Sequence, residues 1–419
     1  MTSSQAPAPS GLASLTSKVV LGFIGTWVIA LMAANLVPVL IAAMRQDLGV
    51  DIGTAGALAT GMTAGSALAM FVTNRFVARA DRPRLGRVGL VLMVVGYGVP
   101  AIWLATPTVM GGLILGGIGA GIMIATGTAA ASSTRNPDRT VATIMIINRV
   151  GATALLAIAP IFHNDLRTVL IVIASLGVFG LIFAGGLPNL PANRVPSAET
   201  AANASGAPSA AIRGTITATA VVLAISMALW SLTEDMVYSM TSVLAQQSGL
   251  SPEVSGMLLA GKVGGGLVGA LVAPLLLRWL GRSWSLVALI LISTATKFIM
   301  ITSASAAAYS VSIIIWGTAY GALLVLVTGL AAVMDVTGRT GVLVFGFYIV
   351  GVAFGPLIGG QFIGVLAPLQ YALLVTVPSA LFGIALFVIA RSRRKYESGN
   401  TTAVVVLPET DAEHEEARA

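Results

Sequence analysis

The chain has 419 residues, of which 56% are hydrophobic and only 9% are charged, whereas soluble proteins have about 25% charged residues. This composition excludes a soluble globular protein and indicates a chain made largely of bilayer-spanning segments. The formal net charge is +7, but the basic residues lie at the ends of apolar segments, so we expect no nucleic-acid partner. Cysteine is absent, which excludes disulfides and thiolate-held clusters.

Apolar segments of membrane length follow one another along the whole chain. They lie at about 18–43, 53–74, 88–106, 109–131, 141–161, 167–187, 214–245, 254–277, 284–303, 308–333, 340–366 and 368–390. Backbone polar groups in hydrocarbon must be satisfied within the segment or the protein, so each segment is predicted to be a helix. Barrel strands would be half as long and would alternate in polarity. The predicted fold class is an all-α membrane protein with twelve transmembrane helices.

The second half of the chain repeats the first at a shift of about 200 positions. The matching pairs are Gln46 with Gln246, Gly49 with Gly249, Gly56 with Gly256, Leu58 with Leu258, Gly61 with Gly261, Gly65 with Gly265, Arg82 with Arg282, Gly121 with Gly321, Arg139 with Arg339 and Gly151 with Gly351. One register through separated blocks indicates a duplicated six-helix unit. We therefore predict an N-terminal bundle at 18–187 and a C-terminal bundle at 214–390. The predicted tails are 1–17 and 391–419, and a proline-rich linker covers 188–213.

Lysine and arginine collect in the connections after the even-numbered segments. These connections and the C-terminal tail carry Arg75, Arg79, Arg82, Arg84, Arg87, Arg135, Arg139, Arg194, Arg213, Arg278, Arg282, Arg339, Arg391, Arg393, Arg394 and Lys395. Positively charged connections stay in the cytoplasm, so both termini are predicted to be cytoplasmic. The first seventeen residues lack the basic start and cleavage site of a secretory signal, so we expect the first segment to remain.

Twelve spans in two repeated units with a cytoplasmic linker resemble the major facilitator superfamily of secondary transporters, over about residues 18–392. Within them, the stretch from 351 to 360 is similar to the GxxxGPxxGG signature that antiporters of this family carry in their fifth span. Here the motif lies in the eleventh span, the repeat equivalent of the fifth. The resemblance implies a conformational role for Gly351, Gly355, Pro356, Gly359 and Gly360. Close helix packing alone would also use small residues at this spacing.

Residues 77–87 resemble the basic loop that this family carries between its second and third spans, usually written G-x-L-A-D-R-x-G-R. Asp81 and Arg82 match, although the leading glycine is absent. Arg278 and Arg282 lie in the equivalent connection of the second half. In the family such loops latch the outward-facing state, so the resemblance implies a gating role for these four residues. Cytoplasmic anchoring would explain the arginines equally well.

A third resemblance is to the fourth-span motif R-x-L-x-G-x-G-x-G of proton-coupled drug antiporters. Gly117, Gly119 and Gly121 match its glycines, but Leu113 stands where the arginine is expected. The resemblance therefore points to the drug/sugar efflux type of proton antiporter without its usual coupling arginine.

Ionisable residues inside spans cost about 2.5–3.5 kcal/mol at mid-helix, so they are candidate functional residues. Glu234 and Asp235 lie in the outer half of the seventh span. Trp230 and Tyr238 are each four residues from Glu234 and share its helix face. Either acid could hold a proton in one state and a cationic or polyol substrate in another. In the alternative interpretation, the span projects beyond the bilayer and the acids touch external water.

Two cations lie in spans that flank the central cavity in the family fold: Lys262 in the eighth and Arg149 in the fifth. They could neutralise Glu234 or Asp235, or they could bind an anionic substrate directly. Arg149 could instead snorkel to the inner surface. Lys297 lies in the ninth, peripheral span, where we expect snorkelling rather than function.

The uncharged candidates for the substrate site are Asn35, Asn148, Trp316 and Tyr320. Asn35 is the repeat partner of Asp235, so an equivalent position would be polar in both halves. The sequence has no phosphate-binding loop, zinc-ligand spacing or nucleophile elbow, and both histidines fall outside the spans. We therefore expect no enzyme activity, no metal and no cofactor.

These observations predict a secondary active transporter that moves a small organic solute across the inner membrane by alternating access. The proton gradient is the expected energy source, and proton-coupled efflux is the leading interpretation. One alternative is uptake or symport of an organic anion at Lys262 and Arg149. A second alternative is a non-transporting sensor or scaffold with the same fold. The expected partners are the substrate, protons and the lipid bilayer, and the expected state is a monomer.

Overall fold

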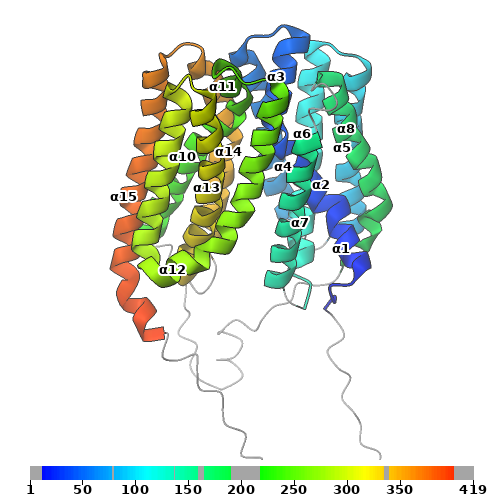
Figure 1. Ribbon diagram of the computed structural model, residues 1–419. Coiled ribbons are helices and arrows are strands. Elements are labelled where there is room, and N and C mark those ends of the chain that lie inside the picture. Colours follow the sequence, from blue (N-terminus) through cyan, green and yellow to red (C-terminus); the bar gives the residue numbers. More distant parts are fainter. Residues whose placement is uncertain are drawn as a thin grey trace, which may run out of the picture.

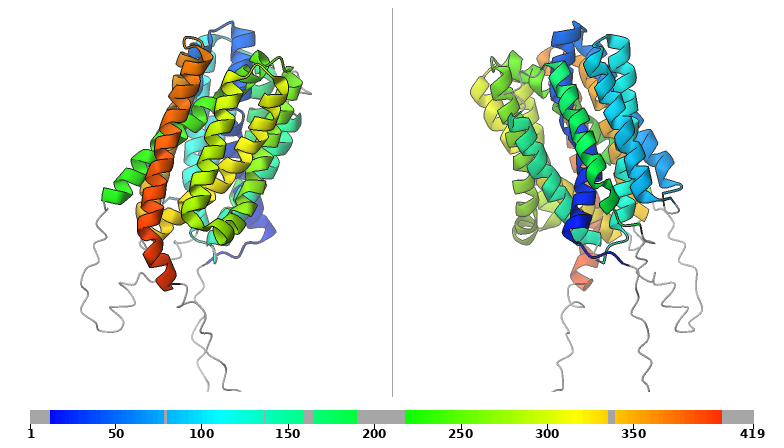
Figure 2. Two further views of the ribbon diagram at one scale, coloured as in Figure 1. Left: turned by 60° about the vertical axis from the view of Figure 1, so that its left-hand side comes forward. Right: turned by 90° about the vertical axis from the view of Figure 1, so that its right-hand side faces the viewer.

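The computed structural model describes residues 12–77, 80–135, 137–158, 165–189, 218–334 and 339–400. This part of the chain is almost wholly helical, and its long helices run roughly along one common axis, as Figure 1 and the two views of Figure 2 show. The helices are α1 (Ser17–Phe23), the π-helical η1 (Ile24–Val28), α2 (Ile29–Asn35), α3 (Val37–Leu48), α4 (Ile52–Asn74), α5 (Arg82–Ile102), α6 (Thr106–Ala131), α7 (Pro137–Ile158), α8 (Leu166–Phe183), the 3-10 turn η3 (Ala184–Gly186), α10 (Ala218–Ser239), α11 (Thr241–Gln247), α12 (Pro252–Thr302), α13 (Ala306–Met334), α14 (Arg339–Ile363) and α15 (Pro368–Asn400). The predicted linker and tails lie mostly outside the described residues.

Eleven helical segments of the described chain are long and apolar enough to cross a membrane. The longest is α12, with 51 residues. Its backbone leaves the helical region at Gly281, where φ is 72°, a conformation that glycine adopts readily. The hydroxyl of Ser285 donates to the carbonyl of Leu276 at 2.9 Å, so the chain turns back on itself at this glycine (Figure 1). The segments predicted at 254–277 and 284–303 are the two arms of α12.

The first and seventh predicted segments each contain a break that the apolar pattern did not indicate. The first bends at Leu36, between α2 and α3, where ψ is 1°. Pro38 follows in the first turn of α3, the helical position in which proline's missing N–H is tolerated. The seventh bends at Met240, between α10 and α11, where ψ is 3°. The two halves therefore share a bent first helix.

The third span begins earlier than predicted, at Arg82 instead of residue 88. Asp81 caps this helix, because its side chain accepts a hydrogen bond from the backbone N–H of Arg84 at 3.2 Å. A proline in the first turn favours the same start. The expectation of a basic loop over 77–87 is therefore wrong in its second part, because Arg82 and Arg84 are helical.

Equivalent residues of the two halves have equivalent conformations. Gly49 and Gly249 both have positive φ, 64° and 79°. Two positions later, Asp51 and Ser251 cap α4 and α12. The shift that aligns the two repeated sequences thus also aligns the starts of these two helices.

The repeat also places glycines where two helix backbones meet. Gly121 of α6 packs directly on the backbone of Ser66 in α4, and Gly321 of α13 packs on Gly266 in α12. A Cβ atom at either glycine would overlap the facing carbonyl oxygen. Both halves are therefore built on the same close helix pair, α4 with α6 and α12 with α13.

Among the described helices, the most extensive contacts between the halves are those of α4 with α14 and of α7 with α12. Gly56 lies against the backbone of Pro356. An ideal Cβ atom on Gly360 would lie 2.7 Å from the carbonyl oxygen of Ile52. These contacts involve the start of α4, at the end of the bundle opposite to the one where the described chain begins and ends (Figure 1). The halves are thus in close backbone contact at that end.

Gly321→Ala is expected to lower the thermal unfolding temperature of the purified protein in detergent. The new methyl group would force α12 and α13 apart, and overpacking of this kind typically costs about 1–3 kcal/mol. The matched control is Gly111→Ala in α6, where no atom lies within 4 Å of the added carbon and alanine is the better helix former. Equal unfolding temperatures for the two variants would contradict the close approach of α12 and α13.

Candidate functional site

Glu234 and Lys297 form a buried ion pair inside the C-terminal half. Glu234 on α10 is 4% exposed and Lys297 on α12 is 0% exposed. The Nζ atom of Lys297 lies 2.5 Å from Oε1 of Glu234 and 2.9 Å from the hydroxyl of Ser379 on α15. Ser293 donates to Oε1 at 3.1 Å, and the indole N–H of Trp316 donates to Oε2 at 2.5 Å. Both carboxylate oxygens therefore have partners, as burial of a charge requires.

This pair overturns two expectations. Lys297 does not snorkel to a surface, because its side chain is fully buried and turned toward α10. Glu234 does not touch external water, and its neutralising cation is Lys297 instead of Lys262 or Arg149. The pair therefore ties α10 to the second arm of α12.

Lys262, on the first arm of α12, has no such carboxylate partner. Its Nζ atom lies 3.9 Å from the ring centre of Tyr238, 4.1 Å from that of Trp316 and 5.2 Å from that of Tyr320. The residue is 8% exposed. Within the described chain it donates no hydrogen bond and forms no ion pair. Aromatic faces attract cations at these distances, so the three rings form an aromatic cage around the ammonium group.

Asp235 has different surroundings from its neighbour Glu234. Successive residues of an α-helix point about 100° apart, and Asp235 is turned toward α14. Its Oδ2 atom lies 2.7 Å from the position of an ideal Cβ on Gly355. The side chain is partly exposed. Among the described residues, none donates a hydrogen bond to this carboxylate or forms an ion pair with it.

Arg149 brings a second cation to this region from the other half. It lies on α7, which packs against α12. Lys262 lies on the first arm of α12, so Arg149 and Lys262 belong to two helices that meet between the halves. The preceding residue, Asn148, is 4% exposed, and its amide nitrogen has no hydrogen-bond partner in the described chain. Asn148 and Arg149 therefore lie on the helix of the first half that packs against the helix of Lys262.

Two further predicted site residues, Tyr238 and Asn35, donate hydrogen bonds to backbone carbonyls. The hydroxyl of Tyr238 donates to the backbone carbonyl of Asn35 at 2.7 Å, which links α10 to α2 of the other half. The amide of Asn35 donates within its own helix to Leu31 at 2.9 Å. Asn35 therefore contacts the site through its backbone carbonyl, while its side chain is hydrogen-bonded within its own helix.

Trp230 is a core residue instead of a wall of the site. It is fully buried, and its ring stacks on Tyr320 at 5.6 Å and on Phe382 at 5.3 Å between ring centres. The aromatic partner of Glu234 is Trp316, on another helix. Tyr348 of α14, which the sequence did not single out, shares a 2.5 Å hydrogen bond with the hydroxyl of Tyr320.

The glycine-proline motif of α14 packs on two helices at once. Gly351, Gly355 and Gly359 are four residues apart and lie against Ser231, Asp235 and Met236 of α10. Pro356 and Gly360, on a neighbouring face, lie against the start of α4. The motif therefore places α14 between Asp235 and the other half.

Two threonines of α4 bond to the backbone of α14 beside this proline. The N–H of Leu357 donates to the hydroxyl of Thr60 at 2.8 Å, and the hydroxyl of Thr63 donates to the carbonyl of Ala353 at 2.8 Å. Residues 353 and 357 are i and i+4 on α14, so their backbone groups are those that pair within a helix. The sequence did not single out either threonine.

Three of the predicted gating residues, Asp81, Arg82 and Arg282, each bind a partner in their own half. Asp81 pairs with Arg84 at 3.1 Å on the surface. Arg82 is 3% exposed and donates to the hydroxyl of Ser133 at 2.5 Å. Arg282 donates to the carbonyl of Leu326 on α13 at 3.2 Å, and Arg278 is exposed. A latch between the halves stays a prediction.

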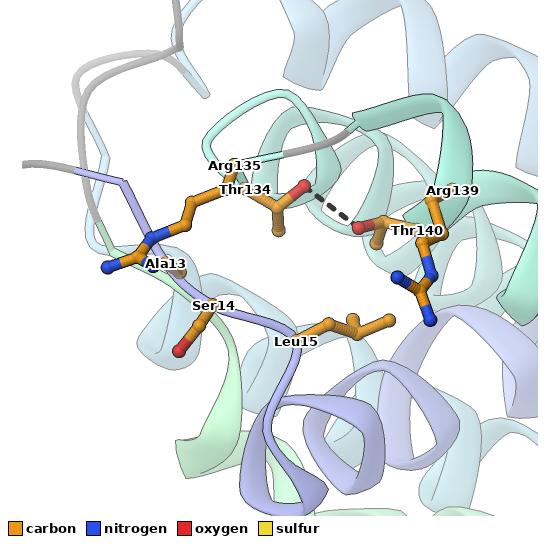
Figure 3. Close-up of a pocket in the computed structure, with 7 residues that line it drawn as sticks. All are labelled: Ala13, Ser14, Leu15, Thr134, Arg135, Arg139 and Thr140. Atoms are coloured by element: carbon orange, nitrogen blue, oxygen red, sulfur yellow. Dashed lines mark hydrogen bonds between the residues drawn. The ribbon is translucent and has the colours of Figure 1, made fainter. Parts of the chain in front are cut away.

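A separate cavity of about 260 Å³ lies beside the N-terminal segment. Figure 3 shows its lining residues, which are Ala13, Ser14, Leu15, Thr134, Arg135, Arg139 and Thr140. The hydroxyls of Thr134 and Thr140 are hydrogen-bonded at 2.9 Å. None of these residues belongs to the cluster around Lys262.

The sequence missed the residues that complete the buried pair. Ser293 and Lys297 are four residues apart and share one face of α12, which was a visible sign of an inward polar stripe. Ser379 lies on α15, a helix without intramembrane charge. No local signal connects it to Glu234, because they are 145 positions apart in the sequence.

Lys297→Met is expected to destabilise the protein by about 3–5 kcal/mol, because it leaves the Glu234 charge buried without a counter-charge. Thermal unfolding in detergent measures the effect. Glu234→Gln combined with Lys297→Met should recover much of the loss. Arg84→Met is the matched control, because it breaks an exposed pair that contributes about 0–1 kcal/mol. Similar losses for Lys297→Met and Arg84→Met would contradict the buried pair.

Comparisons with known proteins agree with this architecture. Solved structures similar to this chain include a variant of the nucleoside transporter NupG, at 12% identity and a TM-score of 0.68, covering 89% of this chain and 99% of that one. A variant of the peptide transporter POT has 13% identity and a TM-score of 0.68, covering 91% and 96%. A bacterial homologue of the human lysosomal transporter Spinster, in an inward-facing and unoccupied conformation, has 12% identity and a TM-score of 0.67, covering 91% and 99%. At these identities the likeness concerns the fold.

A search of curated proteins finds no match. The family model described as Major Facilitator Superfamily matches residues 22–344, which is more than half of the chain. The matched region runs from α1 into α14 and contains both helix pairs of the repeat. The chain is therefore a multi-pass membrane protein that belongs to the Major Facilitator Superfamily of secondary transporters.

Proposed function

We propose that this protein is a proton-coupled transporter of a small organic solute that carries an anionic group. The observation that carries the proposal is a surplus of hydrogen-bond donors where the halves meet. In the described chain, Lys262, Arg149 and the amide nitrogen of Asn148 have no hydrogen-bond acceptor. A buried donor without an acceptor, such as the Asn148 amide, is costly. A carboxylate or phosphate would satisfy it and would form charge-assisted bonds with the ammonium and guanidinium groups. An anionic group is therefore the ligand that suits this site.

The balance of charge supports the same assignment. Glu234 is neutralised by Lys297, which leaves two cations, Lys262 and Arg149, and one acid, Asp235. The cluster has a formal charge of +1 when all three groups are ionised. Protonation of Asp235 raises this charge to +2, and a bound anionic group would offset part of it in surroundings where the dielectric constant is low.

Asp235 is the proposed proton carrier. An ionised Asp235 would repel the substrate anion and compete with it for Lys262, whereas a protonated Asp235 would do neither. Proton and anion would therefore bind together. Asp235 also lies directly against Gly355 of α14, and α14 contacts α4 of the other half. A change of charge at Asp235 would thus act on a helix that must move during alternating access.

The proposed topology has twelve crossings, with one crossing for each arm of α12 and both termini in the cytoplasm. The arginines at the starts of α5 and α14 and at the turn of α12 support this orientation. We infer a monomer in the inner membrane. In this orientation the contacts between the start of α4 and α14 would close the outer side of the site.

Proton-coupled efflux of an organic cation or polyol is the second candidate. Its support is the packing of the glycine-proline motif against Asp235, because that motif resembles an antiporter signature. In this case Asp235 would exchange a proton for the substrate. A non-transporting sensor is the third reading, and it requires ligand binding without solute flux.

Asp235→Asn is expected to abolish the pH dependence of transport while the protein stays folded. Purified protein in liposomes that contain a pH-sensitive dye would be challenged with matched panels of anionic, neutral and cationic small molecules. An anion-triggered uptake of protons that is lost in Asp235→Asn supports symport. Proton movement in the opposite direction with a cation would favour efflux instead. The control variant is Arg84→Met, which breaks the exposed surface pair and tests whether purification and reconstitution alone change the signal.

Lys262→Gln is expected to weaken the binding of the anion found in that panel by at least about tenfold, which corresponds to about 1.4 kcal/mol for a lost charge-assisted bond. Arg149→Gln should have a similar effect, because both side chains contact the same charge. Binding would be measured by isothermal titration in detergent. Unchanged anion affinity in both variants would contradict the anion site, whereas a loss in only one would assign the contact to that residue.

A further inference from the structure

The three rings around Lys262 are held in place by bonds that do not involve the lysine. Tyr238 is anchored by its hydroxyl to the carbonyl of Asn35, and Trp316 is anchored by its N–H to Glu234. Tyr320 is anchored by its hydroxyl to Tyr348. The polar edge of each ring is therefore occupied, and its face is left for the ammonium group. Because the rings are held in place without the lysine, the cage is preorganised to bind an ammonium group.

The surroundings make this cage attractive to any ammonium ion. The carboxylate of Glu234 accepts the indole N–H of Trp316 at 2.5 Å, which increases the electron density of the ring face. Glu234 and Lys297 neutralise each other, so the remaining balance is set by Asp235 and Arg149. A cation that is desolvated between aromatic faces is bound more strongly than one at an exposed site.

We propose that Tyr238, Trp316 and Tyr320 form an ammonium-binding subsite, which Lys262 fills while the transporter is empty and vacates when it pairs with the substrate's anionic group. The second half of this statement rests on the proposed function. The vacated cage can then receive an ammonium group of the substrate itself. The substrate class that satisfies both parts of the site is a small zwitterion.

The first test removes the tethered cation. Lys262→Ala is expected to bind tetramethylammonium at least about tenfold more tightly than the unmodified protein, because the cage is then empty. Tert-butanol, which is similar in size but neutral, should bind neither protein. Lys262→Ala combined with Tyr320→Leu removes one wall and should lose the gained affinity. Equal tetramethylammonium binding with and without Lys262, or equal binding of tert-butanol, would overturn the proposal.

A second measurement needs no change at Lys262. The chain has four lysines, so protein labelled with ¹³C at lysine Cε gives few signals. Ring currents should move the Lys262 signal upfield, and Tyr320→Leu should move it back toward the ordinary position. A Lys262 signal at the ordinary position in the unmodified protein would overturn the cage.

A third measurement tests the substrate class. Glycine betaine carries a trimethylammonium group and a carboxylate, and it should raise the unfolding temperature of the unmodified protein more than acetate and tetramethylammonium together. Stabilisation no greater than that of acetate would refute the zwitterion assignment. The tetramethylammonium test does not depend on transport. If the cage binds tetramethylammonium but the protein carries no anion flux, the result refutes the proposed function and leaves the cage intact.

Discussion

The buried ion pair of Glu234 and Lys297 decides the chemistry of the residues around it. Two charges in apolar surroundings are tolerated only when each is paired and hydrogen-bonded. Once Glu234 has Lys297 and Trp316 as partners, its neighbour Asp235 and the nearby Lys262 remain without them in the described chain. The same bond holds the Trp316 ring with its face toward Lys262. The structural pair thereby leaves a second, unpaired set of charges available for function.

The helix α14 connects this unpaired set to the contact between the halves. On one face Gly355 lies against Asp235, and on another Pro356 lies against the start of α4. Beside the proline, Thr60 and Thr63 bond to backbone groups of α14. A proline removes a backbone donor and bends its helix, so this is a place where α14 can change shape at low cost. Its small residues therefore serve close helix packing, and their role in movement stays a prediction.

Much of the architecture could be predicted, because it depends on local composition and on the repeat. The close contacts of Gly121 and Gly321 lie at a predicted pair of equivalent positions, and the helix caps at Asp51 and Ser251 are separated by the same shift of 200 residues. The prediction for Lys297 was wrong for a physical reason. Apolar spans of similar composition show poorly which face of a helix is turned inward, and a lysine there can either snorkel or pair.

The sequence by itself determined that the chain is a membrane protein of repeated helices, and it identified the rare intramembrane charges. Both conclusions follow from the cost of placing polar groups in hydrocarbon, which acts on every residue locally. Only the tertiary structure decided which charge meets which partner. Glu234 and Lys297 are 63 positions apart, and Lys262 meets aromatic rings from two other helices. Such pairings depend on the rotation and contact of packed helices, which no local pattern encodes.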